Sequence, residues 1–268
     1  MILQNMTPEE KIRQMEILHP YINALAKRAS QKSFDLLKRA SRYPAFLFLP
    51  EREITGMGVW TVVVTVDSKK DAMKGRYTCS AFQTFRVSHS KNPANNGIGI
   101  WLCHSQVGMG VWCCEYPPHY FNRVRERLIA IRGIVQPDFR QLLREVFRFH
   151  HHSLLVINEG TVIKKGEDGL YDVVKDENLQ RRPGYDNMAA FHKEGISLGI
   201  SYDRKYFLYT TFVSNDLLKR TQVEMQKENI RLSNNHDLRM RYDKDAAFIE
   251  EVPVEGHIEF GLEKRYKK

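Results

Sequence analysis

Residues 97–133 read GIGIWLCHSQVGMGVWCCEYPPHYFNRVRERLIAIRG, and this stretch holds the strand and helix signals that decide the fold. Two runs rich in β-branched and aromatic residues flank Gly108-Met109, and a two-residue loop that begins with glycine is typical of a type II′ hairpin turn. Pro117-Pro118 then ends the strand pattern. From His119 to Ile131, apolar residues recur at helical spacing. A hairpin followed by a helix predicts an α+β fold with a mostly antiparallel sheet.

The same hairpin argues against a metal site. Pairing Val107 with Gly110 places Cys103 opposite Cys114 on an apolar face with Trp101, Trp112 and Tyr116, whereas His104 and Cys113 fall on the other face. Four candidate ligands split in this way do not form a zinc site, so we expect buried thiols. His150-His151-His152 also lacks ligand spacing, because neighbouring side chains of an extended chain alternate between faces. We expect no metal and no cofactor.

The N-terminal part, residues 1–117, is predicted to combine helices with the first strands. Thr7-Pro8-Glu9-Glu10 matches a capping box with proline at the first helical position, so a helix begins there and is expected to end near His19-Pro20. A basic amphipathic helix follows between Tyr21 and Ala40. The predicted strands are 45–49, 59–66, 77–87 and 98–107.

Residues 118–230 are predicted to hold a helix pair and a β-meander. The second helix begins at Asp138, short strands follow at 154–157, 161–164 and 170–174, and further strands lie at 188–192, 196–200 and 206–213. Ser214 is predicted to cap a last helix that extends to about Ile230. We expect residues 1–230 to form a single α+β domain and residues 231–268 to form a charged peripheral tail.

Composition limits the function classes. The chain has 268 residues, with 41 Lys and Arg against 32 Asp and Glu, and 42% of it is hydrophobic. This excludes a disordered or fibrous protein. Apolar runs such as Val59–Val66 fall far short of the roughly 20 residues of a membrane helix, so no membrane partner is expected. The absence of a secretory signal pattern after Met1 and the four cysteines favour a cytoplasmic protein.

The first candidate site is the set His119, Arg123 and Arg127. These residues lie four apart and therefore project from nearly one face of a helix. Arginine presents a planar fork to phosphate oxygens, and histidine exchanges a proton near neutral pH, so together they suit the binding and cleavage of a phosphodiester. The alternative is that His119 only follows the prolines at the helix start, while the arginines are solvated or pair with carboxylates such as Glu126.

The stretch HYFNRVRER, residues 119–127, followed by a second helix and antiparallel strands, resembles small toxin-related domains grouped with the RelE-type and barnase-type ribonucleases. The resemblance covers residues 118–213. It implies a metal-independent ribonuclease whose His, Arg, Lys or Tyr side chains, on the sheet and the adjoining helix, bind RNA and stabilise the transition state. The matched positions are His119, Arg123 and Arg127. The preceding hundred or so residues depart from the family's pattern.

A second candidate is a basic surface for nucleic acid, with RNA favoured. Seven arginines and no lysine occur in the two central helices, and such charge attracts phosphate backbones. No motif for base recognition is present, so the alternative is a non-catalytic module that binds nucleic acid or a protein partner. The predicted nucleic-acid-binding residues are Arg140, Arg144, Arg148, Arg181, Arg182, Lys27 and Arg28.

Two further patterns concern the strands. Gly195-Ile196-Ser197-Leu198-Gly199 matches the G-x-S-x-G motif of serine hydrolases, but it continues into strand-like sequence instead of turning into a helix. We therefore expect no serine hydrolase. The last strand, residues 206–213, is rich in Tyr, Thr and Phe. One of these side chains would face the substrate opposite Arg123 in a ribonuclease, or all would belong to the core and its rim.

Overall fold

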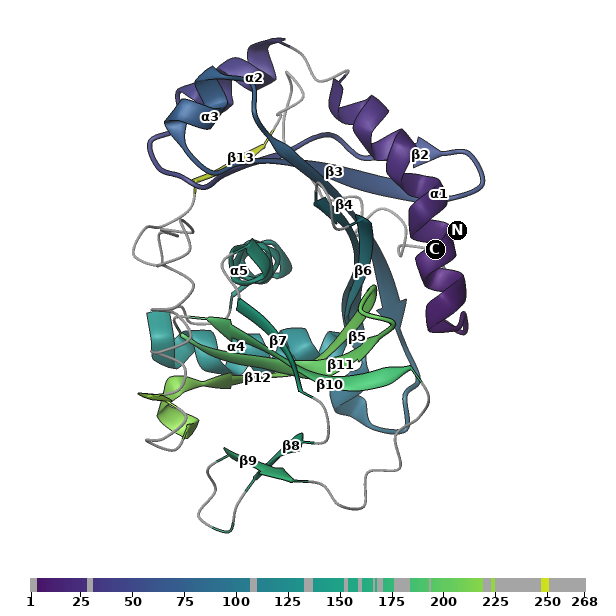
Figure 1. Cartoon of the computed structure of the whole chain (residues 1–268), viewed down its shortest axis with the longest axis vertical. Helices are drawn as coiled ribbons and strands as arrows, with labels where there is room; N and C mark the ends of the chain where they lie inside the picture. Colours follow the sequence, from purple (N-terminus) through teal and green to yellow (C-terminus); the bar gives the residue numbers. More distant parts are fainter. Residues whose placement is uncertain are drawn as a thin grey trace. The chain divides into compact units, whose positions relative to one another are not determined.

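The computed structural model describes residues 4–27, 31–106, 110–132, 137–151, 154–158, 161–165, 167, 171–175, 184–192, 194–218, 223–224 and 247–250. The fold is α+β with a large, mostly antiparallel sheet, as predicted (Figure 1). The chain divides into two compact units, the first comprising Met1–Phe85, Ile100–Glu115 and Lys244–Lys268, the second Arg86–Gly99 and Tyr116–Asp243. No helix within the described ranges is long and apolar enough to cross a membrane.

The first unit is built on strands in the order β13-β1-β3-β4-β5-β6, with β2 paired to β3. The antiparallel pairs include Ala45 opposite Val66 and Thr61 opposite Phe82, and all residues of β1 and most residues of β3 and β4 are buried. Its elements are α1 (Pro8–Lys27), α2 (Gln31–Lys38), β1 (Ala45–Phe48), β2 (Arg52–Ile54), β3 (Gly58–Val66), α3 (Lys69–Met73), β4 (Thr78–Val87), β5 (Gly97–Gln106), β6 (Gly110–Tyr116) and β13 (Ala247–Glu250).

Helix α1 begins as the sequence predicts, because Thr7 and Glu10 form the capping box, with Thr7 N donating to Glu10 Oε2 at 2.8 Å and Glu10 N donating to Thr7 Oγ1 at 3.3 Å. The predicted end at His19-Pro20 is wrong, since the helix continues to Lys27. Met15 and Leu18 before the proline, and Ile22 and Ala26 after it, form one buried stripe, so apolar burial outweighs the hydrogen bond that proline lacks.

The second unit has strands in the order β12-β11-β10-β7, with α4 packed against β12 (Figure 1). Helix α5 begins with a second capping box, in which Gln141 N donates to Asp138 Oδ1 at 2.7 Å. Its elements are η1 (Pro93–Asn95), α4 (Pro118–Arg132), α5 (Phe139–His151), β7 (Leu154–Asn158), β8 (Thr161–Lys165), β9 (Tyr171–Lys175), β10 (Tyr185–His192), β11 (Gly195–Tyr202), β12 (Tyr206–Ser214) and η2 (Asn215–Leu217).

Three segments differ from the sequence expectations. Strand β7 pairs with β10, while β8 and β9 form a separate two-stranded sheet, so residues 154–174 are not one meander. The apolar run of β7 suits the apolar β10, whereas β8 and β9 carry lysines and an aspartate. Residues 247–250, expected in the tail, pair in parallel with β1. After Ser214 the chain forms only the short η2 turn, and most of the predicted last helix lies outside the described residues.

The strands of the predicted hairpin, β5 and β6, are neighbours, while the turn at residues 107–109 lies outside the described ones. All four cysteines are buried thiols, as expected. Burial raises the pKa of the Cys79 thiol to about 12, and it raises the pKa values of the other three further still. Among the described residues, no group of His, Cys, Asp or Glu side chains has an arrangement that holds a metal ion.

Candidate functional site

The first turn of α4 places His119 against β12 through an irregularity in the sheet. The pairing of β11 with β12 matches Leu198 with Thr211 and then Gly199 with Tyr209, so Thr210 is the extra residue of a β-bulge. Thr210 Oγ1 donates to the carbonyl of Leu198 at 3.1 Å, which holds the bulge against β11. The carbonyl of Thr210 accepts a hydrogen bond from the His119 ring.

The surroundings of His119 determine its protonation state. Partial burial lowers its pKa below the 6.5 of an ordinary histidine, and the charge of Arg123 lowers the pKa further, while the bond to Thr210 raises it without reversing the direction. The imidazole is therefore mostly neutral at pH 7. Because its one N–H donates to the Thr210 carbonyl, the other ring nitrogen carries the lone pair. The second ring nitrogen of His119 can therefore accept a proton.

The arginines of the predicted catalytic set follow on the same helix. Arg123 is exposed and its Nη1 lies 2.8 Å from Glu126 Oε2, with side chains 51% and 56% exposed. The predicted alternative of a Glu126 pair is therefore present, but an exposed pair of this kind contributes little to stability. Arg127, one turn further along, is half-buried. The structure brings His119 and Arg123 close together and places Arg127 on the same helix.

The predicted nucleic-acid-binding residues have different environments. Arg140 and Arg144 are half-buried on α5. Burial lowers the pKa of Arg144, the charge of Arg140 lowers it further and Asp138 opposes this, so two guanidiniums lie near each other. Lys27 is exposed at the end of α1. Arg28, Arg181 and Arg182 lie outside the described residues.

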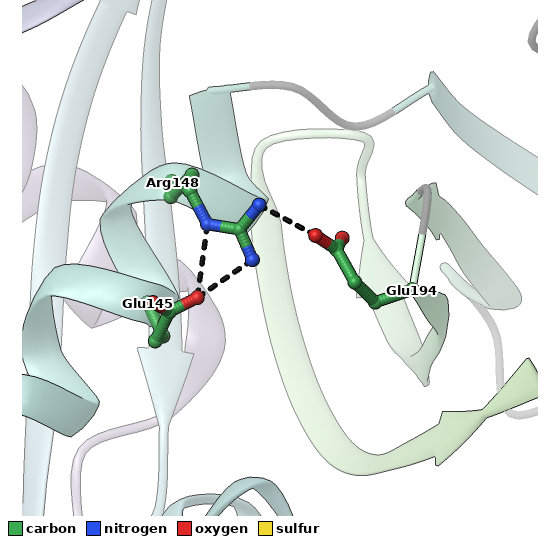
Figure 2. A network of polar contacts seen from close by, with 3 residues as sticks. All are labelled: Glu145, Arg148 and Glu194. Carbon is green, nitrogen blue, oxygen red and sulfur yellow. Dashed lines mark hydrogen bonds and ion pairs between the residues drawn. The ribbon is translucent and has the colours of Figure 1, made fainter. Parts of the chain in front are cut away.

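Arg148 is held in a mostly buried ion triad, which Figure 2 shows. Its Nη2 lies 2.6 Å from Glu145 Oε2 on the same helix, and its Nη1 lies 2.6 Å from Glu194 Oε1 in the connection between β10 and β11. Burial alone lowers the pKa of Arg148, but the two carboxylates outweigh it and raise the pKa above its ordinary value. Two negative charges already surround this guanidinium, so it does not offer a free positive charge to phosphate.

A buried chain of hydroxyls and a ring holds α4 on the sheet. Tyr120 Oη lies 2.6 Å from Ser197 Oγ on β11, and Ser197 Oγ lies 2.7 Å from His192 Nε2 on β10. All three residues are at most 2% exposed. Since Tyr120 follows His119, this chain and the Thr210 bond connect the first turn of α4 to three adjacent strands.

The Ser197 environment also explains the G-x-S-x-G match. Ser197 lies within β11 and is fully buried, as expected for a strand residue and not for a nucleophile at a sharp turn. A Cβ at Gly195 would lie 2.1 Å from the carbonyl oxygen of Val213, and one at Gly199 would lie 2.0 Å from that of Leu208. Glycine is required at both positions because β12 passes too close for a side chain.

In the Ser197→Ala variant, the free energy of unfolding is expected to be roughly 2–4 kcal/mol lower than in the wild type. The reason is that Tyr120 and His192 each lose a buried hydrogen bond, and a buried group left without its partner costs about 1–3 kcal/mol. Urea unfolding followed by circular dichroism measures this difference. The control is Ser88→Ala at an exposed position, where a loss within about 0.5 kcal/mol is expected. Equal losses in the two variants would show that the chain of hydroxyls does not stabilise the fold.

The aromatic side chains of β12 belong to the core. Tyr206, Tyr209 and Phe212 are at most 4% exposed. Tyr209 stacks on Tyr116 with centroids 4.4 Å apart and planes at 5°. Tyr116 Oη lies 2.8 Å from His150 Nδ1, which connects the end of β6 to the end of α5. These rings support α4 from the sheet side and do not face a substrate.

Sequence reasoning missed Thr210 and Glu194. The bulge that frees the Thr210 carbonyl has no local sequence signal, and Glu194 meets Arg148 across 46 positions of chain. Searches against protein-family models, curated proteins and solved structures give no match, so the assignment of a function depends on the geometry of His119, Arg123 and their neighbours.

Proposed function

We propose that the chain binds RNA through arginines of α4 and α5 and that His119 accepts a proton in a metal-independent cleavage of the RNA backbone. The observation that carries the proposal is the position of His119 in the first turn of α4, because burial and the nearby guanidinium of Arg123 keep the imidazole mostly neutral, and the hydrogen bond to the Thr210 carbonyl orients the ring. A general base next to a phosphate-binding group is what this reaction requires. The resemblance of residues 118–213 to toxin-related ribonucleases supports the same class of reaction.

The proposed reaction uses the RNA's own 2′-hydroxyl as the nucleophile. His119 takes the proton of that hydroxyl, the 2′ oxygen forms a bond to phosphorus, and the bond from phosphorus to the 5′ oxygen breaks. The leaving 5′ oxygen takes a proton from water, and the RNA is left with a 2′,3′-cyclic phosphate. Arg123 and Arg127 would stabilise the negative charge that grows on the phosphate oxygens.

Arg140 and Arg144 extend the proposed contact along α5. The charge of Arg140 lowers the pKa of Arg144, so the two guanidiniums repel each other, and a bound phosphate between them relieves this repulsion. Arg148 is left out of the proposed surface, because Glu145 and Glu194 already neutralise it.

The test of binding is the salt dependence of RNA affinity. The double variant Arg123→Gln/Arg127→Gln is expected to make the plot of log affinity against log salt shallower by about 1.4, which is about 0.7 for each phosphate that the variant no longer neutralises. Fluorescence anisotropy with 2′-O-methyl RNA, which lacks the reactive hydroxyl, measures binding without cleavage. The control, Arg52→Gln/Lys91→Gln, removes the same charge at exposed positions outside α4 and α5. An unchanged slope in the α4 variant would contradict the proposed contact.

A further inference from the structure

The first unit carries a second exposed basic surface that the proposed site does not use. It surrounds α3, in the connection between β3 and β4, where all but the buried Ala72 and the half-buried Asp71 of residues 69–77 are exposed. This segment contains four cationic residues and one carboxylate, Asp71. We call this surface the α3 patch, and its members are Lys69, Lys70, Met73, Lys74, Arg76 and Tyr77.

The α3 patch is a well-defined structure even though α3 is short. Asp71 N donates to Ser68 Oγ at 3.1 Å, which caps the start of the helix. Gly75 has φ +63°, and Gly75 N donates to the Ala72 carbonyl at 3.2 Å while Arg76 N donates to the Asp71 carbonyl at 2.9 Å. This is a Schellman closure, in which glycine takes the left-handed position. The cations are therefore displayed on a segment fixed at both ends.

Two large side chains in the α3 patch remain exposed. Met73 is 64% exposed and Tyr77 is 36% exposed. The Tyr77 ring contacts Phe34 of α2, with centroids 5.4 Å apart and planes at 39°, and α2 packs against α3 (Figure 1). The ring is thus supported on one side and accessible to solvent. Exposed cations beside a supported, accessible aromatic ring are the elements of a single-stranded nucleic acid site.

We infer that the α3 patch binds single-stranded RNA, with Tyr77 stacking on an unpaired base and Lys69, Lys70 and Lys74 contacting the phosphates. This rests on the proposed RNA-binding function and adds the class of substrate to it. In a duplex the base faces are covered by their neighbours, so Tyr77 contributes nothing there. A lipid surface fits less well, because a peripheral membrane site presents a broad apolar face, and here the exposed apolar groups are Met73 and one aromatic ring.

The test measures binding of the full chain to a labelled single-stranded 2′-O-methyl RNA and to the same strand annealed to its complement. Lys69→Gln/Lys70→Gln/Lys74→Gln is expected to lower affinity for the single strand at least tenfold and to make the salt slope shallower by about 2. Arg13→Gln/Arg52→Gln/Lys91→Gln removes the same charge elsewhere and is expected to change the affinity less than threefold. Thermal melting checks that each variant is folded.

Variants of Tyr77 distinguish the contribution of base stacking from that of positive charge. Tyr77→Leu is expected to weaken single-strand binding roughly tenfold and duplex binding not at all, whereas Tyr77→Phe keeps the ring and the affinity. Equal binding of both RNAs with no effect of Tyr77→Leu would overturn the inference. Binding to phosphatidylserine vesicles is measured in parallel. Lysine variants that lose vesicle binding but keep RNA binding would also overturn the inference. If the Arg123/Arg127 variant loses RNA affinity while the α3 variants keep it, the inference fails and the proposed function stands. If the wild type binds no RNA, both the inference and the proposed function fail.

Discussion

Replacement of His119 by alanine is expected to lower the rate of RNA cleavage by roughly 10²- to 10⁴-fold, the contribution of a positioned general base. RNA binding is expected to persist, because the proposed phosphate contacts come from the arginines and His119 is mostly neutral. The rate is measured by gel separation of the products of a labelled RNA in EDTA. His19→Ala is the matched control, since His19 is also a half-buried helical histidine, 3.2 Å from Asn23 Nδ2, and its loss is expected to leave the rate unchanged.

The pH profile of the wild type provides a further check on the His119 assignment. The base acts in its neutral form, so activity is lost as the pH falls through the pKa of His119. Because partial burial and Arg123 lower that pKa, the midpoint of this loss is expected below 6.5, with a plateau by neutral pH. A midpoint above 6.5, or equal loss of activity in His19→Ala and His119→Ala, would assign the proton transfer to another group.

Arg148→Met is expected to destabilise the fold by about 3 kcal/mol, because it leaves Glu145 and Glu194 in a mostly buried site without their cation. Chemical unfolding of the full chain measures this loss. Arg125→Met removes an exposed arginine that donates to Asn122 Oδ1 on the same helix, and a change within about 0.5 kcal/mol is expected there.

A double variant tests whether the effect of Arg148 passes through the triad. Glu194→Gln removes one of the two charges, so Arg148→Met/Glu194→Gln is expected to lose less stability than the sum of the two single variants. Additive losses, or an Arg148→Met variant no less stable than Arg125→Met, would show that the triad does not hold the β10–β11 connection to α5. RNA affinity is expected to remain, since Arg148 lies outside the proposed surface.

Local signals in the sequence predicted much of the fold. Thr7 and Asp138 begin helices because their side chains satisfy backbone N–H groups of the first turn, and this chemistry acts within four residues. The apolar spacing of α4 and α5 likewise predicts their buried faces. Pro20 shows where local reasoning fails, because the buried stripe on both sides of it outweighs the residue's own preference. The partners of β7 and β13 depend on contacts between distant segments, which no local pattern reports.

The candidate site was predictable only in part. The helical spacing of His119, Arg123 and Arg127 follows from the sequence and is present in α4. The features that position His119 are non-local, since the Thr210 carbonyl becomes available through a bulge in β12 and the Tyr120–Ser197–His192 chain joins three elements. The charge of Arg148 was visible in the sequence, but the carboxylate that helps to neutralise it lies 46 residues away.

Metal-independent cleavage of RNA is tested most directly by incubating the purified wild-type chain in EDTA with a labelled single-stranded RNA. The same RNA with one 2′-deoxynucleotide is incubated in parallel, and the products of both are measured. We predict cleavage without metal, products ending in a 2′,3′-cyclic phosphate, and no cleavage at the deoxynucleotide, because His119 then has no 2′-hydroxyl to deprotonate. Salt-sensitive binding without cleavage would reduce the chain to a nucleic-acid-binding module. If the chain neither binds nor cleaves the RNA, that result would contradict both the proposed binding and the proposed cleavage.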